Sequence, residues 1–538
     1  MRRMSLRAGL SIAAFAGSCA AAVMGGAASS SSSAVLQAPA PPSRARRIAN
    51  ATTELDIERA RRLLEEGEVD SPALTFERAR LAIYTGDCDA ASAILASPVF
   101  SAASEGTSMP ELARSCARAT AGSVVIDEPR QGVRIRLQDE ADRALVPFIV
   151  SVAERSRAII ERDLGVVLPR PLRIDLVRDL FSLSAVSGLP LSAAETTGTV
   201  AVARWGRVTM LSPRATPLGY QWEDTLAHEI THLALSRATR DKAPLWLQEG
   251  IAKREETRWR AERPFDDTPS ADAVAHAALV SGRSVGVDQL GASIAMLPTP
   301  EAASTAFAEV TSFMAYFVEK QGEAALRLLL ADLKGIDSDD PSEALRSVTG
   351  YELPAWIAFW REHLLEGVKQ SPQIAQETLD RGRDPAQGAE LSRRVRLGDL
   401  LFAGGHVEAA ATQLGPAVKL APAEAAVRWR AARALLLAGD EEQAKQALGD
   451  EKDIQSVHGA WFAWHGRFLK RAAEAVSAER AFALGIAADP YSEDVACEGQ
   501  RRASAGKSAG KVSGGGLPLP DDPQRRALCA AARAFARD

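Results

Sequence analysis

The chain has 538 residues, of which 46% are apolar and 25% charged, and its formal net charge is −5 at pH 7. These proportions are those of a folded soluble protein and exclude a disordered, collagen-like or polytopic membrane chain. The small net charge gives no reason to expect nucleic acid as a partner. At about 150 residues per domain, the length predicts three to four structural units.

The N-terminus has the pattern of an export signal. Three arginines lie within the first seven residues, and the run 8–28 is uncharged and rich in alanine and glycine. This pattern predicts a signal peptide over residues 1–28. Two alternatives are a lipoprotein signal that ends at a lipidated Cys19 and an uncleaved membrane anchor. We therefore expect a periplasmic, envelope-anchored or secreted protein that meets a membrane only through this segment.

The middle of the chain alternates between strand and helix patterns. Residues 53–95 have the apolar spacing of helices, and 139–164 is a further helix. Short runs with apolar alternation or β-rich composition predict strands at 132–137, 172–177, 199–203 and 207–211. The remainder to about residue 368 is mostly helical. A small mixed sheet followed by helices is an α+β arrangement.

The C-terminal part repeats itself. Residues 401–410 align with 436–445, and Pro422 and Pro490 stand about two such periods apart. A period of about 34 residues, with small residues at the turn, resembles tetratricopeptide repeats, and a third unit is expected over 461–490. An ordinary helical bundle is the alternative.

Apart from Cys19, the four cysteines form two local pairs, Cys88 with Cys116 and Cys497 with Cys529. In an exported protein they predict two disulfides, although four cysteines allow three connectivities. Each bridge would close a loop of about 30 residues and stabilise the fold by roughly 3–4 kcal/mol. Four buried free thiols are the alternative.

One motif carries chemistry. His228, Glu229 and His232 form the pattern HExxH within an otherwise uncharged run. On a helix the two imidazoles lie one turn apart on one face and can reach a single metal ion. Glu229 lies beside them, where it can take a proton from a metal-activated water. An accidental pair on a solvated helix is the alternative.

A catalytic zinc needs a third protein ligand, and Glu249 is the best candidate. It lies in a second predicted helix that begins near Pro244, after a loop that can turn the chain back. Its flanks are apolar, so its carboxylate needs a partner, which one zinc ion per chain would supply. Alternatively Glu249 faces solvent or pairs with Lys253, and Asp241 in the loop is the next candidate ligand.

The motif followed by PLWLQEGIA at 244–252 resembles the gluzincin metallopeptidases, in particular the bacterial peptidase MA-like family. Residues 311–322 and 353–360 resemble later helices of that family, so the resemblance extends loosely over 172–365. It implies a zincin-like fold and a peptidase activity. It also implies a role for each motif residue: His228, His232 and Glu249 ligate zinc, and Glu229 is the general base.

Two positions depart from that family. Lys253 stands where many gluzincins have an acidic residue four positions after the ligand glutamate, and Phe307 stands where a tyrosine is expected. No transition-state stabiliser is therefore assigned, and Tyr316 and His276 are the candidates, although each can be an ordinary helix residue. We expect an extended peptide to pair with an edge strand at 207–211.

The predicted fold class is thus α+β: a zincin-like metallopeptidase domain flanked by regions of α-helical hairpins. The expected divisions are a signal peptide at 1–28, a low-complexity tether at 29–50, a helical region at 51–122, the peptidase domain at 123–368, the repeats at 369–500, and a flexible linker with a terminal helix at 501–538.

The predicted function is an exported zinc metallopeptidase that hydrolyses peptide bonds through a metal-activated water. Its helical repeats would dock a peptide or protein substrate, or a protein partner. Two other hypotheses remain: a non-catalytic scaffold on a peptidase-like fold, and a hydrolase of some non-peptide amide. The intact Glu229 favours the peptidase, because a scaffold has no physical need for it.

Overall fold

The computed structural model describes most of the chain after residue 42. The described ranges are 43–66, 71–97, 100, 109–216, 219–266, 269–291, 293–335, 341–367, 385–455, 457–498 and 523–535. The predicted signal peptide, Cys19, most of the tether and the predicted linker lie outside them. Within these ranges, no helix is both long and apolar enough to cross a membrane.

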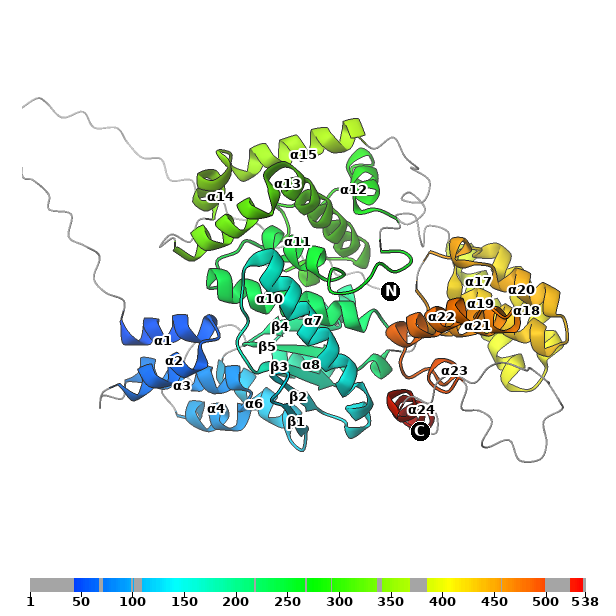
Figure 1. The fold of residues 1–538 in the computed structure, drawn as a ribbon, viewed down its shortest axis with the longest axis horizontal. Helices are drawn as coiled ribbons and strands as arrows, with labels where there is room; N and C mark the ends of the chain where they lie inside the picture. Colours follow the sequence, from blue (N-terminus) through cyan, green and yellow to red (C-terminus); the bar gives the residue numbers. More distant parts are fainter. Residues whose placement is uncertain are drawn as a thin grey trace, which may run out of the picture. The chain divides into compact units, whose positions relative to one another are not determined.

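The described part of the chain before the sheet contains the helices α1 (Arg44–Thr53), α2 (Ile57–Glu65), α3 (Pro72–Thr85), α4 (Cys88–Leu95) and α6 (Met109–Thr120) (Figure 1). The Ser43 side chain accepts a hydrogen bond from the Arg46 N–H and so caps α1. The boundary expected at residue 50 therefore falls inside a helix. A disulfide joins Cys88 in α4 to Cys116 in α6.

The sheet has five strands in the order β1-β2-β3-β5-β4. Their bounds are β1 (Val124–Glu128), β2 (Val133–Leu137), β3 (Leu172–Val177), β4 (Ala201–Arg204) and β5 (Arg207–Leu211). β2, β3 and β5 run parallel, whereas β1 and β4 pair antiparallel with β2 and β5. The sheet is therefore mixed, and β1 was not among the predicted strands.

The expectation that 207–211 is the edge strand is wrong. β5 lies between β3 and β4, and each of its residues is buried. The tight turn at Trp205 and Gly206, both with positive φ, folds β4 back along the outer side of β5. β4 is consequently the edge strand on this side of the sheet, and β1 is the edge strand on the other side.

Helices cover both faces of the sheet. Val208 and Met210 of β5 share a core with α7 (Val146–Leu164) and α10 (Trp222–Thr239). Leu211 instead packs with Leu183 of α8 (Leu180–Ser187). The 3-10 helix η1 (Glu140–Leu145) precedes α7, and α9 (Leu191–Thr197) leads into β4.

A helical layer follows α10. It consists of α11 (Leu245–Glu255), α12 (Ala271–Val280), the 3-10 helix η3 (Ile294–Met296), α13 (Pro300–Gly335), α14 (Ser342–Thr349) and α15 (Leu353–Gly367). The ring of Phe313 in α13 lies edge-on between Trp246 of α11 and Trp360 of α15, at centroid distances of 5.3 and 5.8 Å. This aromatic stack holds α11 in place.

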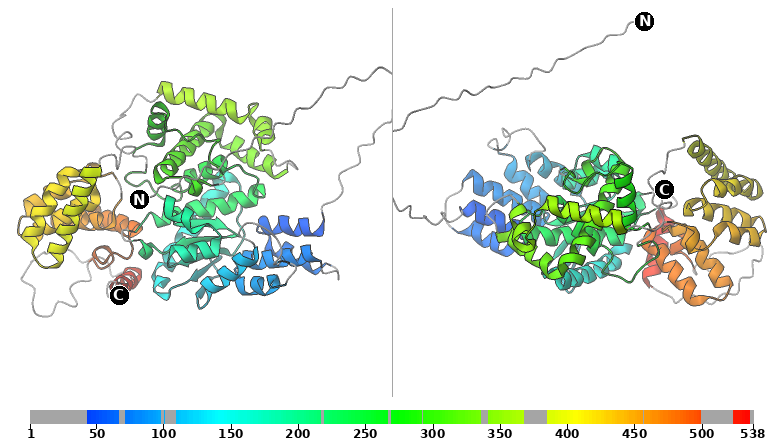
Figure 2. Two further views of the ribbon diagram at one scale, coloured as in Figure 1. Left: turned by 180° about the vertical axis from the view of Figure 1, so that it is seen from behind. Right: turned by 90° about the horizontal axis from the view of Figure 1, so that it is seen from above.

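The C-terminal part is made of helix pairs: α17 (Pro385–Ala403) with α18 (Val407–Leu420), α19 (Ala425–Leu437) with α20 (Glu441–Leu448), and α21 (Gly459–Arg471) with α22 (Ala475–Ala488). These are the yellow and orange helices of Figure 2. The short α23 (Glu493–Ala496) and the terminal α24 (Pro523–Phe535) follow, and a disulfide joins Cys497 to Cys529. The described fold is mostly helical with one small mixed sheet, which is an α+β arrangement.

Candidate metal centre

The site is built on two consecutive helices. α10 begins with Glu223 and Asp224 in its first turn, where acidic side chains suit the helix dipole. It ends at Thr239, and the C-cap residue Arg240 and the next residue, Asp241, adopt positive φ angles of 55° and 61°. This left-handed turn reverses the chain, so that α11 packs against α10. The reversal brings Glu249 of α11 back to the HExxH residues.

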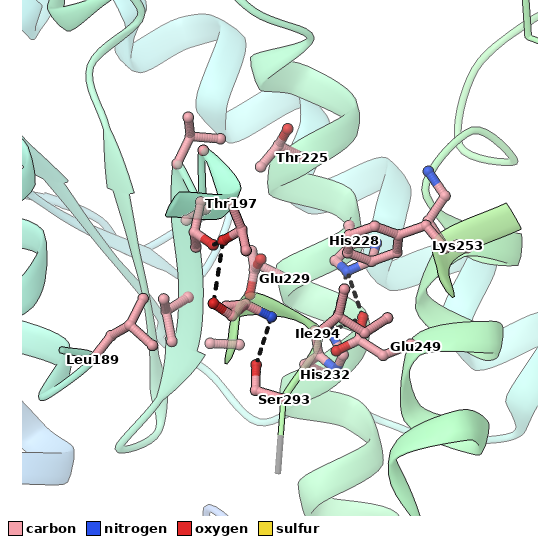
Figure 3. A pocket seen from close by; sticks show the side chains of 18 of the residues that line it. Leu189, Thr197, Thr225, His228, Glu229, His232, Glu249, Lys253, Ser293 and Ile294 are labelled. Carbon is pink, nitrogen blue, oxygen red and sulfur yellow. Dashed lines mark hydrogen bonds and ion pairs between the residues drawn. The ribbon is translucent and has the colours of Figure 1, made fainter. Parts of the chain in front are cut away.

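Three of the predicted residues meet at one point (Figure 3). The Nε2 atoms of His228 and His232 are 3.1 Å apart, and each lies 3.5–3.6 Å from Glu249 Oε2. Zinc bonds of about 2.0–2.2 Å in a tetrahedral arrangement place ligand atoms about 3.3–3.5 Å apart. The spacing and chemistry of this donor set fit a zinc ion. Among the described residues, no other such group of three is found.

Glu249 owes its position to a close approach between helices. A Cβ on the next residue, Gly250, would lie 3.0 Å from Met314 Cβ and 3.1 Å from the Val310 carbonyl oxygen. These atoms belong to α13, so α11 and α13 touch almost backbone to backbone here. Glycine allows this close approach without a displacement of either helix, and the approach positions Glu249 beside the two histidines.

The donor set lies in a pocket of about 340 Å³ beside the edge strand. Its described lining includes residues 197–203, which comprise the end of α9 and most of β4, the segment 293–295 and Phe307. The Leu211 N–H bonds to the Val200 carbonyl, so by alternation the main-chain groups of Ala201 and Ala203 point away from β5. The outer edge of β4 therefore borders the pocket.

Glu229 lies on the β4 side of the donor set. The Ala203 N–H, one of the outward-pointing groups of β4, faces this carboxylate and lowers its pKa. Burial raises the pKa of Glu229, against the opposing charges of His232 and His228. The Glu229 side chain thus lines the pocket, and it lies close enough to both histidines for their charges to lower its pKa.

Sequence reasoning missed Glu256. Its Oε2 lies 3.1 Å from His228 Nδ1, on the side of the ring away from Glu249, and its Oε1 pairs with Lys253 Nζ. The signal was present, because positions 249, 253 and 256 are spaced i, i+4 and i+7 and lie on one face of a helix. An acidic partner was expected at position 253 itself.

Neighbouring carboxylates determine the proton affinity of His228. Burial alone would lower the pKa of His228, but its hydrogen bonds to Glu249 and Glu256 outweigh burial and raise the pKa to about 10. Burial opposes ionisation of Glu249, yet the charge of His232 and the bonds to both histidines hold its pKa well below the ordinary value. His228 and Glu249 therefore attract each other as a protonated imidazole and an ionised carboxylate.

The charges around the pocket favour a divalent cation. Its described lining contains three carboxylates, those of Glu229, Glu249 and Glu256, and one ammonium group, that of Lys253. With the histidines neutral, as metal ligands must be, and the three carboxylates ionised, these groups carry a charge of minus two in a largely buried space. Buried charge needs compensation, and one divalent ion supplies it.

The other candidate residues lie elsewhere. The ring of Tyr316 lies 4.9 Å from that of His363 and 6.3 Å from that of Trp356, and His276 is half-buried in α12. Neither is among the described residues that line the pocket. Asp241 is exposed in the turn after α10 and is not part of the donor set. Phe307 does line the pocket, with its ring 6.4 Å from that of His228.

No family model matches the chain, and no curated protein matches it either.

Proposed function

We propose that this protein is a zinc-dependent peptidase of the gluzincin type. The observation that carries the proposal is the donor set of His228, His232 and Glu249, with nitrogen and oxygen atoms 3.1–3.6 Å apart. Glu229 adjoins the set, and an edge strand with outward-pointing main-chain groups borders the pocket. Three protein ligands leave the fourth tetrahedral position for reactants.

The remaining assignments belong to the same proposal. The region from about 123 to 368 would be a zincin-like domain of the peptidase MA-like group. The helix pairs from α17 to α22 would be tetratricopeptide-like repeats that dock a peptide, a protein substrate or a protein partner. The chain would be exported, with its signal peptide removed or with Cys19 lipidated.

The metal ligands and Glu229 would have separate roles in hydrolysis. Zinc, when bound, supplies Lewis-acid polarisation of the scissile carbonyl and increases the acidity of the attacking water. Glu229 accepts a proton from that water as the oxygen bonds to the carbonyl carbon. Glu229 then gives this proton to the amide nitrogen as the carbon–nitrogen bond breaks, and a carboxylic acid and an amine leave.

The edge strand would position the substrate. An extended peptide can pair with β4 through the outward N–H and carbonyl of Ala201 and the carbonyl of Ala203, whereas the Ala203 N–H faces Glu229. Such pairing would recognise the main chain of the substrate rather than its side chains, and it would place the scissile bond between Glu229 and the donor set.

The test is cleavage of a mixed peptide library, read by mass spectrometry of new termini, with the wild type and Glu229→Gln side by side. Glu229→Gln should keep its zinc and lose at least about 100-fold in rate, the usual contribution of a general base. If Glu229→Gln cleaves as fast as the wild type, the proposed mechanism is refuted.

A non-catalytic binding protein on the same fold is the second candidate. It is favoured by one observation: among the described residues that line the pocket, there is no tyrosine, and no histidine besides the two ligands. For this candidate, no peptide of the library is cleaved, whereas zinc still binds.

A further inference from the structure

We propose that Lys253 and Glu256 form a positioning relay that holds His228 in its metal-binding orientation. The inference rests on the proposed zinc site and adds two residues to it. Neither residue is a ligand, so both act through the imidazole of His228.

The contacts form a chain of three side chains. Glu256 Oε2 lies 3.1 Å from His228 Nδ1, and Glu256 Oε1 forms an ion pair with Lys253 Nζ. His228 Nε2 remains on the opposite side of the ring, beside His232 and Glu249. One carboxylate thus bridges a cation and a ligand ring, with each of its oxygens engaged.

The bond at Nδ1 decides which ring nitrogen is free for a metal. A carboxylate at Nδ1 keeps the proton there, so that Nε2 offers its lone pair to the ion. It also fixes the rotation of the ring and makes the ligand more basic. Glu256 can do this only while its own carboxylate stays in place.

Lys253 holds that carboxylate in place. The Glu256 side chain is 19% exposed, and a carboxylate at this depth is costly without a cation. Lys253 lies one turn away on α11, and its ammonium group is 5.8 Å from the centre of the Phe307 ring at the pocket wall. An exposed lysine–glutamate pair would contribute little, but this pair has its second oxygen on a ligand histidine.

The experiment measures zinc affinity of the full-length protein by competition with a chromophoric chelator. The variants are Glu256→Gln, Lys253→Met, Lys253→Arg and the double variant Glu256→Gln with Lys253→Met. The matched control is Glu255→Gln, the same change one residue earlier, where the carboxylate pairs with Arg254 rather than with a histidine. Thermal unfolding of the zinc-free proteins shows whether each variant is folded.

We expect Glu256→Gln to weaken zinc binding by about 10- to 100-fold, and Lys253→Met to weaken it by a smaller factor. Lys253→Arg should restore the affinity and Glu255→Gln should leave it unchanged. The double variant should bind no more weakly than Glu256→Gln alone, because Lys253 acts only through Glu256. The visible spectrum of the cobalt-substituted protein should change in Glu256→Gln and not in Glu255→Gln.

The relay is refuted if Glu256→Gln binds zinc as tightly as the wild type. It is also refuted if Lys253→Met weakens zinc binding by the same factor in the wild type and in the Glu256→Gln variant. If Glu256→Gln does not fold, the comparison of Lys253→Met with Lys253→Arg still decides, and equal affinities refute the relay. A wild type that binds no zinc refutes the proposed function itself, which is a different outcome.

Discussion

Replacing Gly250 by alanine tests whether the contact between α11 and α13 positions Glu249 in the proposed metal site. The added Cβ would lie 3.0 Å from Met314 Cβ and 3.1 Å from the Val310 carbonyl oxygen, whereas ordinary carbon contacts begin near 3.4 Å. Neither atom is the free end of a flexible side chain. The two helices must therefore separate by a few tenths of an ångström.

Two opposing effects determine how much Gly250→Ala changes the free energy of unfolding. Alanine is favoured over glycine inside a helix by about 1 kcal/mol. Overpacking a close contact costs about 1–3 kcal/mol. Gly250→Ala should thus change the free energy of unfolding by between about 0 and 2 kcal/mol in the destabilising direction. Because Glu249 precedes Gly250, the same displacement should weaken zinc binding.

Gly388 provides the matched control. It also lies inside a helix, α17, but a Cβ built there meets no atom within 4 Å. Gly388→Ala should stabilise its helix by up to about 1 kcal/mol and leave zinc affinity unchanged. Urea unfolding of the zinc-free proteins and chelator competition measure the two effects. A Gly250→Ala protein that is stabilised like Gly388→Ala and binds zinc like the wild type refutes the reasoning.

Two further predictions concern stability. Burial raises the pKa of Asp489 to about 6 from the ordinary 3.8, against hydrogen bonds from the N–H groups of Tyr491 and Ser492. The folded state therefore holds this proton more tightly, and the stability it contributes below pH 4 is lost as the pH rises through 6. Asparagine at position 489 cannot titrate, so the free energy of unfolding of Asp489→Asn, relative to that of the wild type, should rise by about 2–3 kcal/mol between pH 4 and pH 7. Urea unfolding measures this difference, and a difference that does not change with pH contradicts the prediction. Phe313→Ala removes the ring between Trp246 and Trp360 and should cost about 3–5 kcal/mol by the same measurement, whereas a loss below 1 kcal/mol contradicts the stacking.

The donor set could be predicted because its three residues lie close together in the sequence. His228 and His232 stand one turn apart in a pattern that few other functions require, and Glu249 was singled out by its apolar flanks. The structure brings all three together because the turn at Arg240 reverses the chain. The sequence of that turn does not reveal its left-handed backbone.

The parts that were missed depend on contacts between elements. β4 and β5 were both predicted as strands, but which of them lies at the edge depends on pairing with β3, far away in the chain. Glu256 was not predicted because the resemblance to gluzincins points to position 253 alone, whereas Glu256 lies one turn further along the same face. Tyr316 was a candidate by its sequence position, but its ring packs with Trp356 of α15.

The most direct test of the proposed metal site is zinc per chain, measured by elemental analysis of the wild type, Glu249→Ala and Asp241→Asn. Asp241 is the control, an exposed acidic residue in the turn between the two site helices, and asparagine tolerates its left-handed backbone. The wild type and Asp241→Asn should hold about one zinc each, and Glu249→Ala should lose it. A wild type without zinc after metal is supplied, or a Glu249→Ala protein that keeps it, would contradict the proposed site.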